Sequence, residues 1–208
     1  MKIIGHRGAR GEAPENTKSS IDVAMRAGVS MIEVDLRLSG DTVVLSHDPL
    51  LADRTYYSLA ELLTQVSGKI PLNLEIKEIQ AVDKLARLLG NYSGEILLSS
   101  FDFKTLRSCR QLLPNIPLAV LESWSGIRAT YRARKLNTKR LHMNQRWLWS
   151  GFISSMTRRG WALFAYTVNS QEQAVRFERA GLHGIFTDFP SKFTIYYKEQ
   201  SNQRGEKL

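Results

Sequence analysis

The sequence predicts an α/β protein that folds as a closed (β/α)8 TIM barrel in a single small domain. Two observations carry this prediction. Short apolar runs alternate with stretches of helical periodicity along nearly the whole chain, which indicates βαβ units and a parallel sheet. The unit repeats about eight times, which favours a closed barrel over an open sheet. The 208 residues lie near the lower end of the size range for this fold, so we expect little decoration.

Each predicted element follows from its own pattern. The apolar runs that we interpret as strands cover residues 2–6, 31–38, 43–47, 71–77, 95–101, 117–122, 140–144, 161–169 and 183–188. The helical stretches between them cover residues 17–27, 59–66, 79–90, 102–113, 126–135, 150–159 and 170–180. C-cap glycines such as Gly28 and Gly160 close several helices, and Asn16 is the expected N-cap of the first. We expect a barrel over residues 1–190 and a tail over 191–208 whose polar end frays.

One pair of strands departs from the repeat. Gly40 and Asp41 join two strand-like runs directly, which is a hairpin signal. We interpret the pair as an extension of the second barrel strand that folds back over the mouth of the barrel. Such a hairpin returns His47 toward Glu33 and Asp35, which lie on the second strand.

The composition is typical of a globular protein and excludes several classes. No apolar run approaches the ~20 residues that span a bilayer, and the first residues lack the apolar segment of a secretory signal. Cytoplasmic residence is therefore the expectation. The single cysteine, Cys109, has no partner for a disulfide or a CxxC motif and is expected to be a packed or idle thiol.

The net charge of +9 is unevenly distributed. Residues 101–160 contain twelve Lys or Arg against two Asp or Glu. A solvated helical face is the commonest explanation for such a run. Attraction of phosphate groups or of an anionic membrane surface is the alternative, so peripheral membrane contact stays open. The chain contains no recognisable nucleic-acid motif, and we expect no nucleic-acid partner.

Acidic and histidine side chains recur at the ends of predicted strands. Side chains alternate between the two faces of a strand, so Glu33 and Asp35 share one face. His6 ends the first run, His47 ends the third, and Glu75 lies near the end of the fourth. A (β/α)8 barrel carries its chemistry at the C-terminal ends of its strands. We therefore predict that these five side chains converge on one rim.

This set of side chains indicates a metal site with an acid and a base. Carboxylates packed closely repel one another unless a positive charge lies among them. Glu33, Asp35 and Glu75 offer the hard oxygen ligands that suit Mg²⁺ or Ca²⁺, whereas the absence of cysteine makes zinc less expected. His6 and His47 suit a general acid/base pair because imidazole titrates near neutral pH.

Two cations complete the predicted site. Arg7 follows His6, and Lys77 follows Glu75 on the same face of its strand. Both add fixed positive charge for an anion such as phosphate. Metal-binding carboxylates, two histidines and cationic side chains together predict phosphoryl chemistry on a diester.

Five ordered motifs resemble one known family. They are HRGARGEAPENT, EVDLRLSGDTVVLSHDP, LEIK, YTVN and GIFTDFP. The chain resembles the glycerophosphodiester phosphodiesterases from Ile3 to about Pro190, almost its whole length. The resemblance implies a (β/α)8 barrel and attack of the glycerol 2-hydroxyl on phosphorus. A cyclic phosphate would form, and water would open it to glycerol 3-phosphate.

The resemblance also implies roles for single positions. It implies an acid and a base (His6, His47), ligands for one divalent cation (Glu33, Asp35, Glu75) and phosphate contacts (Arg7, Lys77). Two alternatives stay open within catalysis: a lysophospholipase D and a phospholipase that forms a cyclic product at the same site. A third alternative is a non-catalytic basic binding module.

The sequence departs from the family at two places. Tyr166 occupies a position where the family usually has Trp, which implies an altered glycerol pocket. The segment between SHDP and LEIK lacks most of the usual capping insertion, which implies an open mouth that admits bulkier or lipid-bearing diesters. Trp147, Trp149 and Phe152 are expected to be buried in helix or barrel packing, with lipid contact as the alternative.

Other polar residues receive structural interpretations. His142 and His183 have no catalytic partner nearby in sequence and are expected to be structural. Asp188 ends the last strand, where it can serve either as a structural hydrogen-bond partner or as a support for the site. Glu122 also lies at the end of a predicted strand, at the level of the mouth, but its residue type alone does not justify a functional role.

Overall fold

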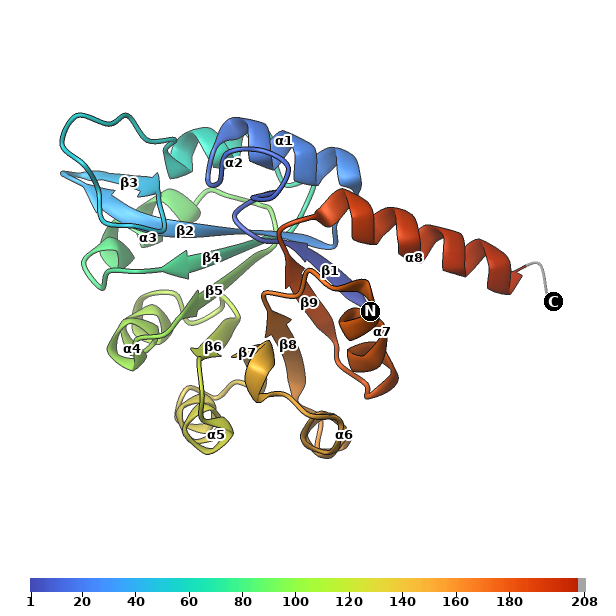
Figure 1. Cartoon of the computed structure of the whole chain (residues 1–208). Coiled ribbons are helices and arrows are strands. Elements are labelled where there is room, and N and C mark those ends of the chain that lie inside the picture. Colours follow the sequence, from blue (N-terminus) through green and yellow to red (C-terminus); the bar gives the residue numbers. More distant parts are fainter. Residues whose placement is uncertain (206–208) are drawn as a thin grey trace.

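The structure is a computed structural model that describes residues 1–205, with side chains described for residues 1–200. Its barrel strands are β1 (Lys2–Gly5), β2 (Met31–Ser39), β4 (Leu72–Ile76), β5 (Ile96–Ser100), β6 (Leu118–Glu122), β7 (Arg140–Asn144), β8 (Ala162–Tyr166) and β9 (Gly184–Thr187). Neighbouring strands pair in parallel in the order β1-β9-β8-β7-β6-β5-β4-β2, and a β1–β2 pairing closes the ring (Figure 1). The predicted closed barrel is confirmed.

Helices surround the barrel and lie between successive strands. They are α1 (Lys18–Ala27), α2 (Leu59–Val66), α3 (Ala81–Leu89), α4 (Phe103–Leu112), α5 (Gly126–Lys135), α6 (Ser150–Arg158), α7 (Gln171–Arg179) and α8 (Pro190–Gly205), with a short 3-10 turn η1 (Gln145–Trp147). The predicted helices begin and end within two residues of those observed, and α2 and α5 match their predicted bounds. Amphipathic periodicity therefore located every helix except α8.

Helix α8 occupies the region for which the sequence predicted a tail. Pro190 begins the helix, and Phe193 is fully buried in the main core. Tyr197, one turn further on, packs against the same core, and α8 contacts α1 and β1. The structure therefore has a helix as far as Gly205 where the sequence predicted a tail, while residues 206–208 lie outside the described residues. The largely polar composition hid this helix, since only a few apolar side chains anchor it.

The barrel has an apolar shell outside its strands and a mixed interior. On β2, Ile32 and Val34 point outward into the core between strands and helices, while Glu33 points inward. Ile4 and Phe186 belong to a smaller apolar cluster inside the barrel. In the strand register Ile4 lies below the level of Glu33, so the inner cluster forms a floor beneath the polar mouth. Cys109 is buried outside the barrel, and burial raises the pKa of its thiol to about 12, as expected for a packed thiol.

The predicted hairpin is present. Strand β3 (Thr42–Leu45) runs antiparallel to the end of β2, and Gly40 in the turn has a positive φ of 56° that glycine adopts without strain. The amide of Ser46 then donates to the Asp35 carbonyl at 3.0 Å. The guanidinium of Arg37 donates twice to the His47 carbonyl, at 2.9 and 3.1 Å. These bonds fix the returning chain so that His47 comes back to the mouth.

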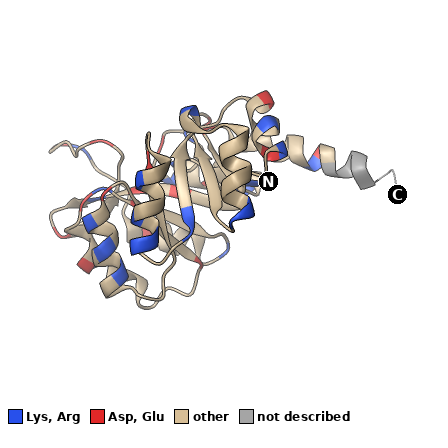
Figure 2. Ribbon diagram, turned by 90° about the horizontal axis from the view of Figure 1, so that it is seen from below, with Lys and Arg blue, Asp and Glu red and all other residues tan. Residues whose placement is uncertain are grey.

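Much of the basic charge of residues 101–160 lies at the base of the barrel. Arg110, Arg134, Lys135 and Arg158 belong to the last turns of α4, α5 and α6. Helices in this fold run opposite to the strands, so their C-termini are remote from the mouth. Cations are favourable at helix C-termini, and Figure 2 shows Lys and Arg recurring along the surrounding helices.

Within residues 1–205, the structure has no helix with both the length and the apolar character needed to span a bilayer.

Candidate active site

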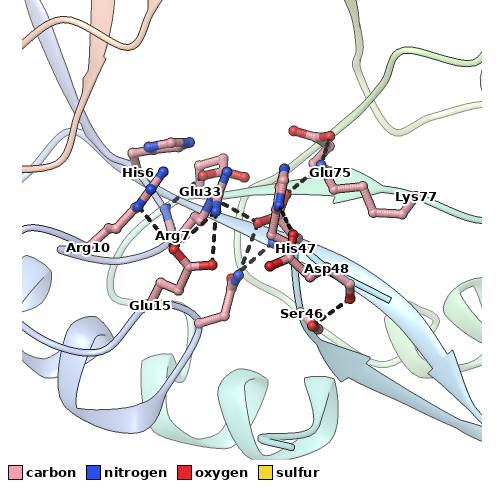
Figure 3. A network of polar contacts seen from close by, with 12 residues as sticks. His6, Arg7, Arg10, Glu15, Glu33, Ser46, His47, Asp48, Glu75 and Lys77 are labelled. Atoms are coloured by element: carbon pink, nitrogen blue, oxygen red, sulfur yellow. Dashed lines mark hydrogen bonds and ion pairs between the residues drawn. The ribbon is translucent and has the colours of Figure 1, made fainter. Parts of the chain in front are cut away.

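Three carboxylates meet inside the mouth of the barrel. Glu33 and Asp35 lie on β2 and Glu75 lies on β4, where Asp35 and Glu75 are direct partners in the strand register. One oxygen from each carboxylate lies within 4.8 Å of the others, and all three residues are buried. The predicted convergence of the acidic residues is therefore what the structure shows (Figure 3).

The electrostatics of this cluster fit a divalent cation. Burial raises the pKa of Glu33 well above its ordinary value, and the neighbouring carboxylates of Asp35 and Glu75 raise it further. Oxygen Oε2 of Glu33 accepts a 2.8 Å hydrogen bond from the Arg7 amide. Oxygen Oε1 is buried with no hydrogen-bond partner among the described residues. A buried cluster of hard oxygen donors with an unsatisfied atom is the environment that Mg²⁺ or Ca²⁺ suits.

Lys77 supplies positive charge to the carboxylates. Its Nζ lies 2.8 Å from Asp35 Oδ1 and also contacts Glu75 Oε1. Although burial alone would raise the pKa of Asp35, the charges of Lys77 and Arg7 hold that pKa below its ordinary value. The resemblance implied a phosphate contact for Lys77, and in the structure its ammonium group contacts carboxylates at the cavity wall.

Arg7 likewise supports the carboxylates. Its Nη1 donates to both carboxylate oxygens of Glu15, at 2.9 and 3.0 Å, and its Nε lies 3.2 Å from Asp35 Oδ2. Arg10 shares Glu15 through a 3.0 Å ion pair and lines the same cavity with a more exposed side chain. Sequence reasoning missed Arg10, which is the second arginine of the loop motif. Its greater exposure makes it available to an anionic ligand.

Asn16 reaches into the site instead of capping a helix. Its Nδ2 donates to Asp35 Oδ2 at 3.0 Å, and its Oδ1 accepts from the Asp35 amide at 3.1 Å. Thr17 is the true N-cap of α1, so the predicted N-cap was wrong by one residue. The reason lies in the backbone: Asn16 has a positive φ of 56°, whereas Thr17 is extended as an N-cap requires.

His6 is oriented by a chain of hydrogen bonds. Its Nδ1 lies 2.6 Å from Asp188 Oδ1, and Asn169 donates to Asp188 Oδ2 at 2.8 Å. Although burial alone would raise the pKa of Asp188, the hydrogen bonds from His6 and Asn169 hold that pKa below its ordinary value. An anionic Asp188 keeps the Nδ1 proton in place and leaves Nε2 available to the cavity. Of the two roles open for Asp188, the structure favours support of the site.

His47 has a similar but more exposed arrangement. Its Nδ1 lies 2.8 Å from Asp48 Oδ1, where the adjacent residue in the motif supplies the carboxylate. His47 and His6 both line one cavity of about 170 Å³. Six of the seven predicted site residues line this cavity, and Asp35 lies just behind its wall.

The opposite wall of the cavity is largely apolar. Leu121, Tyr166 and Phe186 line it from β6, β8 and β9, together with Phe101, which directly follows β5. The ring of Tyr166 meets Phe101 edge-on at 6.0 Å, and its hydroxyl donates to the Glu122 carbonyl at 2.9 Å. Sequence reasoning singled out Tyr166 but missed the other three, because strand patterns do not say which inward side chains reach the mouth.

The remaining histidines and Glu122 have structural environments. His142 is fully buried inside the barrel, its ring packs against Phe164 and Phe186, and burial lowers its pKa to about 3. Neither ring nitrogen has a hydrogen-bond partner within the described part of the chain. Glu122 is buried, and its carboxylate accepts two hydrogen bonds from the Arg128 guanidinium, each 2.6 Å long. None of these carboxylate or imidazole groups lines the cavity.

Residues 6–60 and 63–192 match the model of the glycerophosphoryl diester phosphodiesterase family. The chain belongs to this family. YhdW of Bacillus subtilis is 31% identical over 91% of this chain and 95% of its own length. The glycerophosphodiester phosphodiesterase of Caldanaerobacter subterraneus is 26% identical over 90% of this chain and 94% of its own length. A phosphodiesterase of Oleispira antarctica, solved with the product sn-glycerol-3-phosphate, has a TM-score of 0.86 and 26% identity, covering 92% of this chain and 94% of its own.

Family membership confirms the resemblance read from the motifs. It makes the protein a phosphoric diester hydrolase and disfavours the non-catalytic binding module. The roles of the individual histidines and the identity of the metal stay predictions.

Proposed function

We propose that the protein hydrolyses glycerophosphodiesters to glycerol 3-phosphate and an alcohol, with a divalent cation and histidine acid/base catalysis. One observation carries the proposal: two histidines, each paired through Nδ1 with an aspartate, face one cavity that also holds three converging carboxylates. The product-bound relative from Oleispira antarctica supports the choice of substrate class.

Glu33, Asp35 and Glu75 would hold the cation, and Mg²⁺ or Ca²⁺ matches their oxygen ligands. When bound, the cation supplies Lewis-acid stabilisation of the charge on the phosphate. Asn16 orients Asp35 through its two hydrogen bonds, and Lys77 limits the repulsion among the carboxylates. These neighbours place the ligand oxygens before substrate arrives.

The two imidazoles move the protons. Asp188 and Asp48 each hold a proton on Nδ1 of their histidine, so Nε2 carries out the transfers. The Nε2 atom of one histidine accepts the proton of the glycerol 2-hydroxyl while the hydroxyl oxygen forms a bond to phosphorus. The other histidine, protonated at Nε2, gives that proton to the leaving alcohol as the bond between the alcohol oxygen and phosphorus breaks. Water then opens the cyclic phosphate with the two roles reversed, which restores both histidines.

The cations and the apolar wall bind the substrate. Arg10 is the exposed cation of the cavity and would contact the phosphate oxygens. Phe101 and Tyr166 would pack against the carbon atoms of glycerol or of the alcohol. Their exclusion of water strengthens the electrostatic interactions at the phosphate.

A product assay tests the proposal. Glycerophosphocholine is incubated with the protein in Mg²⁺, in Ca²⁺ and in a chelator, and the phosphorus products are identified by ³¹P NMR. We expect glycerol 3-phosphate to accumulate with at least one metal and not in the chelator. Absence of cleavage with both metals would overturn the proposal.

Lysophospholipase D action is the second candidate for the same site. The exposure of Phe101 at the edge of the cavity favours it, since an apolar side chain at the edge of the site can contact an acyl chain. Release of choline and lysophosphatidic acid from lysophosphatidylcholine would identify it, and release of a cyclic phosphate would identify the phospholipase alternative.

A further inference from the structure

Exposed apolar side chains gather on one side of the mouth. We call this set the apolar rim: Phe101, Trp124, Ile127, Trp147 and Trp149. Each follows the C-terminal end of a barrel strand: Phe101 follows β5, Trp124 and Ile127 follow β6, and the other two follow β7. Ile127 is 86% exposed and Trp149 is 63% exposed, so neither side chain contributes to the core. The rim lies over α4, α5 and α6, which Figure 1 shows on the side of the barrel away from β3.

Ring contacts connect parts of the rim to one another and to the cavity wall. Trp149 contacts the ring of Phe152 at 5.2 Å between centroids. Phe152 in turn lies against Gly126, where a Cβ atom would come within 2.8 Å of its ring. This contact joins the start of α5, with Ile127, to the start of α6. At the other end Phe101 packs edge-on against Tyr166 of the cavity wall, so the rim extends outward from the site.

The exposure of Trp147 and Trp149 contradicts the packing expected from the sequence, whereas Phe152 packs against the core as expected. Trp124, Trp147 and Trp149 are each more than half exposed, whereas Trp161 is buried. Large aromatic side chains are costly to leave in water, and an exposed apolar patch with polar neighbours marks an interaction surface. Lipid contact, the alternative for Trp147 and Trp149, therefore fits the structure better than burial.

Two arginines lie beside the rim. Arg128 lies over the Trp124 ring at 4.1 Å, and Arg146 is exposed in the turn next to Trp147. Within residues 101–160, all of which the structure describes, the two acidic side chains are engaged. Asp102 is exposed beside Phe101 but caps α4 through the Thr105 amide, and the buried Glu122 pairs with Arg128. Arg146 is therefore the arginine beside the rim whose charge is available to lipid phosphates, and exposed tryptophans with such a cation are typical of the interface of a membrane.

We propose that the apolar rim docks the mouth of the barrel on a phospholipid membrane that carries anionic head groups. Trp124, Trp147 and Trp149 lie at the level of the head groups, Ile127 inserts among the acyl chains, and Arg146 faces lipid phosphates. Docking in this orientation opens the cavity toward the lipid surface along Phe101. If the proposed function holds, lipid-bearing diesters then reach the site without crossing bulk water.

Vesicle binding tests the proposal independently of hydrolysis. The full chain is mixed with vesicles of phosphatidylcholine alone or with an equal part of phosphatidylserine, some with brominated acyl chains that quench tryptophan. We expect sedimentation with the anionic vesicles and quenching of the exposed tryptophans. Absence of binding to the anionic vesicles, or binding without quenching, would overturn the proposal.

Matched variants locate the contact. Ile127→Ser and Trp149→Ser should each weaken vesicle binding by about tenfold, and Arg146→Gln by about fivefold. The controls are Ile195→Ser, an exposed apolar residue of α8, and Arg159→Gln at the base of the barrel. Equal losses in rim and control variants would contradict docking through the rim. A different outcome would be self-association of the protein without vesicle binding. If Trp149→Ser abolished that self-association, the occupant of the rim would be a second copy of the chain, and the proposal would be overturned.

Activity separates this proposal from the proposed function. Ile127→Ser and Trp149→Ser lie outside the cavity and should hydrolyse water-soluble glycerophosphocholine at the unaltered rate. A protein that binds vesicles through the rim but cleaves no diester would refute only the proposed function. A protein that cleaves glycerophosphocholine but ignores anionic vesicles would refute only the docking.

Discussion

The two halves of the barrel mouth are built from the same strand–helix repeat but carry different side chains. The half formed by β1 to β4 holds both cavity histidines and all three clustered carboxylates. The half formed by β5 to β8 presents Phe101, Leu121 and Tyr166 to the cavity and continues outward as the apolar rim. The difference arises from the side chains at the strand ends and from the β2–β3 hairpin, which occurs in the first half and carries His47 back to the mouth.

This division has a physical reason. Buried carboxylates need compensating positive charge nearby. The charges of Arg7, Lys77 and a metal ion can compensate all three carboxylates only if these lie close together. An apolar wall opposite them lowers the local dielectric and strengthens their interaction with substrate. We therefore expect substitutions in the first half to change the reaction rate and those in the second half to change binding.

The largest effect should come from the histidines. His6→Ala or His47→Ala should lower kcat for glycerophosphocholine by about 10³-fold, since each removes a proton-transfer group. Thermal unfolding should show that the fold is retained. His183→Ala, which removes an imidazole far from the cavity, is the matched control. Turnover by either site variant at the wild-type kcat would remove these roles.

Loss of a metal ligand should rank next. Glu75→Gln should raise the metal concentration for half-maximal activity at least about tenfold, because a neutral amide replaces a charged ligand. Isothermal titration with Mg²⁺ and Ca²⁺ measures the same loss without turnover. Glu172→Gln on the exposed face of α7 is the control. Equal metal affinity in both variants would show that Glu75 is not a ligand.

The support of His6 should matter less than His6 itself. Asp188→Asn should lower kcat about tenfold and leave KM nearly unchanged, because the imidazole loses the partner that fixes its Nδ1 proton. Steady-state kinetics with glycerophosphocholine measure both constants. An increase in KM at constant kcat would instead place Asp188 in substrate binding.

The apolar half should affect binding. Phe101→Ala should raise KM for glycerophosphocholine by about threefold to tenfold, since it removes part of an apolar wall, and kcat should change little. Leu112→Ala, an exposed apolar residue at the end of α4, is the control. A fall in kcat at constant KM would contradict the division of labour between the two halves.

The last prediction concerns stability and not activity. Burial lowers the pKa of His142 from 6.5 to about 3, so between these values the unfolded chain binds a proton that the folded chain does not. Stability therefore falls as the pH falls below 6.5, by about 1.4 kcal/mol per pH unit from this group. His142→Leu should remove this slope in urea unfolding measured across the acid range. If the difference in unfolding free energy between variant and wild type did not change with pH, the buried imidazole would not be neutral in the folded protein.

The sequence predicted the fold and the clustered residues but not their supporting contacts. Strand periodicity and strand ends are local properties, and they were enough to bring His6, Glu33 and Glu75 to one mouth. The contact between His6 and Asp188 joins residues 182 positions apart, so no local pattern reveals it. Only the closing of β1 against β9 places these two residues together.

Two further errors came from patterns with more than one meaning. Asn16 is a good N-cap by residue type, but its positive φ turns the side chain toward Asp35. Large aromatics are buried more often than not, yet Trp147 and Trp149 lie in a loop whose neighbours leave them exposed. Backbone conformation and exposure depend on tertiary packing, which composition does not contain.

A crystal structure of the protein with Mg²⁺ and glycerol 3-phosphate tests the division of the mouth most directly. We expect the ion bound by Glu33, Asp35 and Glu75, the phosphate between His6 and His47, and the open side of the ligand facing Phe101. An ion bound away from Glu75, or a phosphate that contacts only one of the two histidines, would contradict the account.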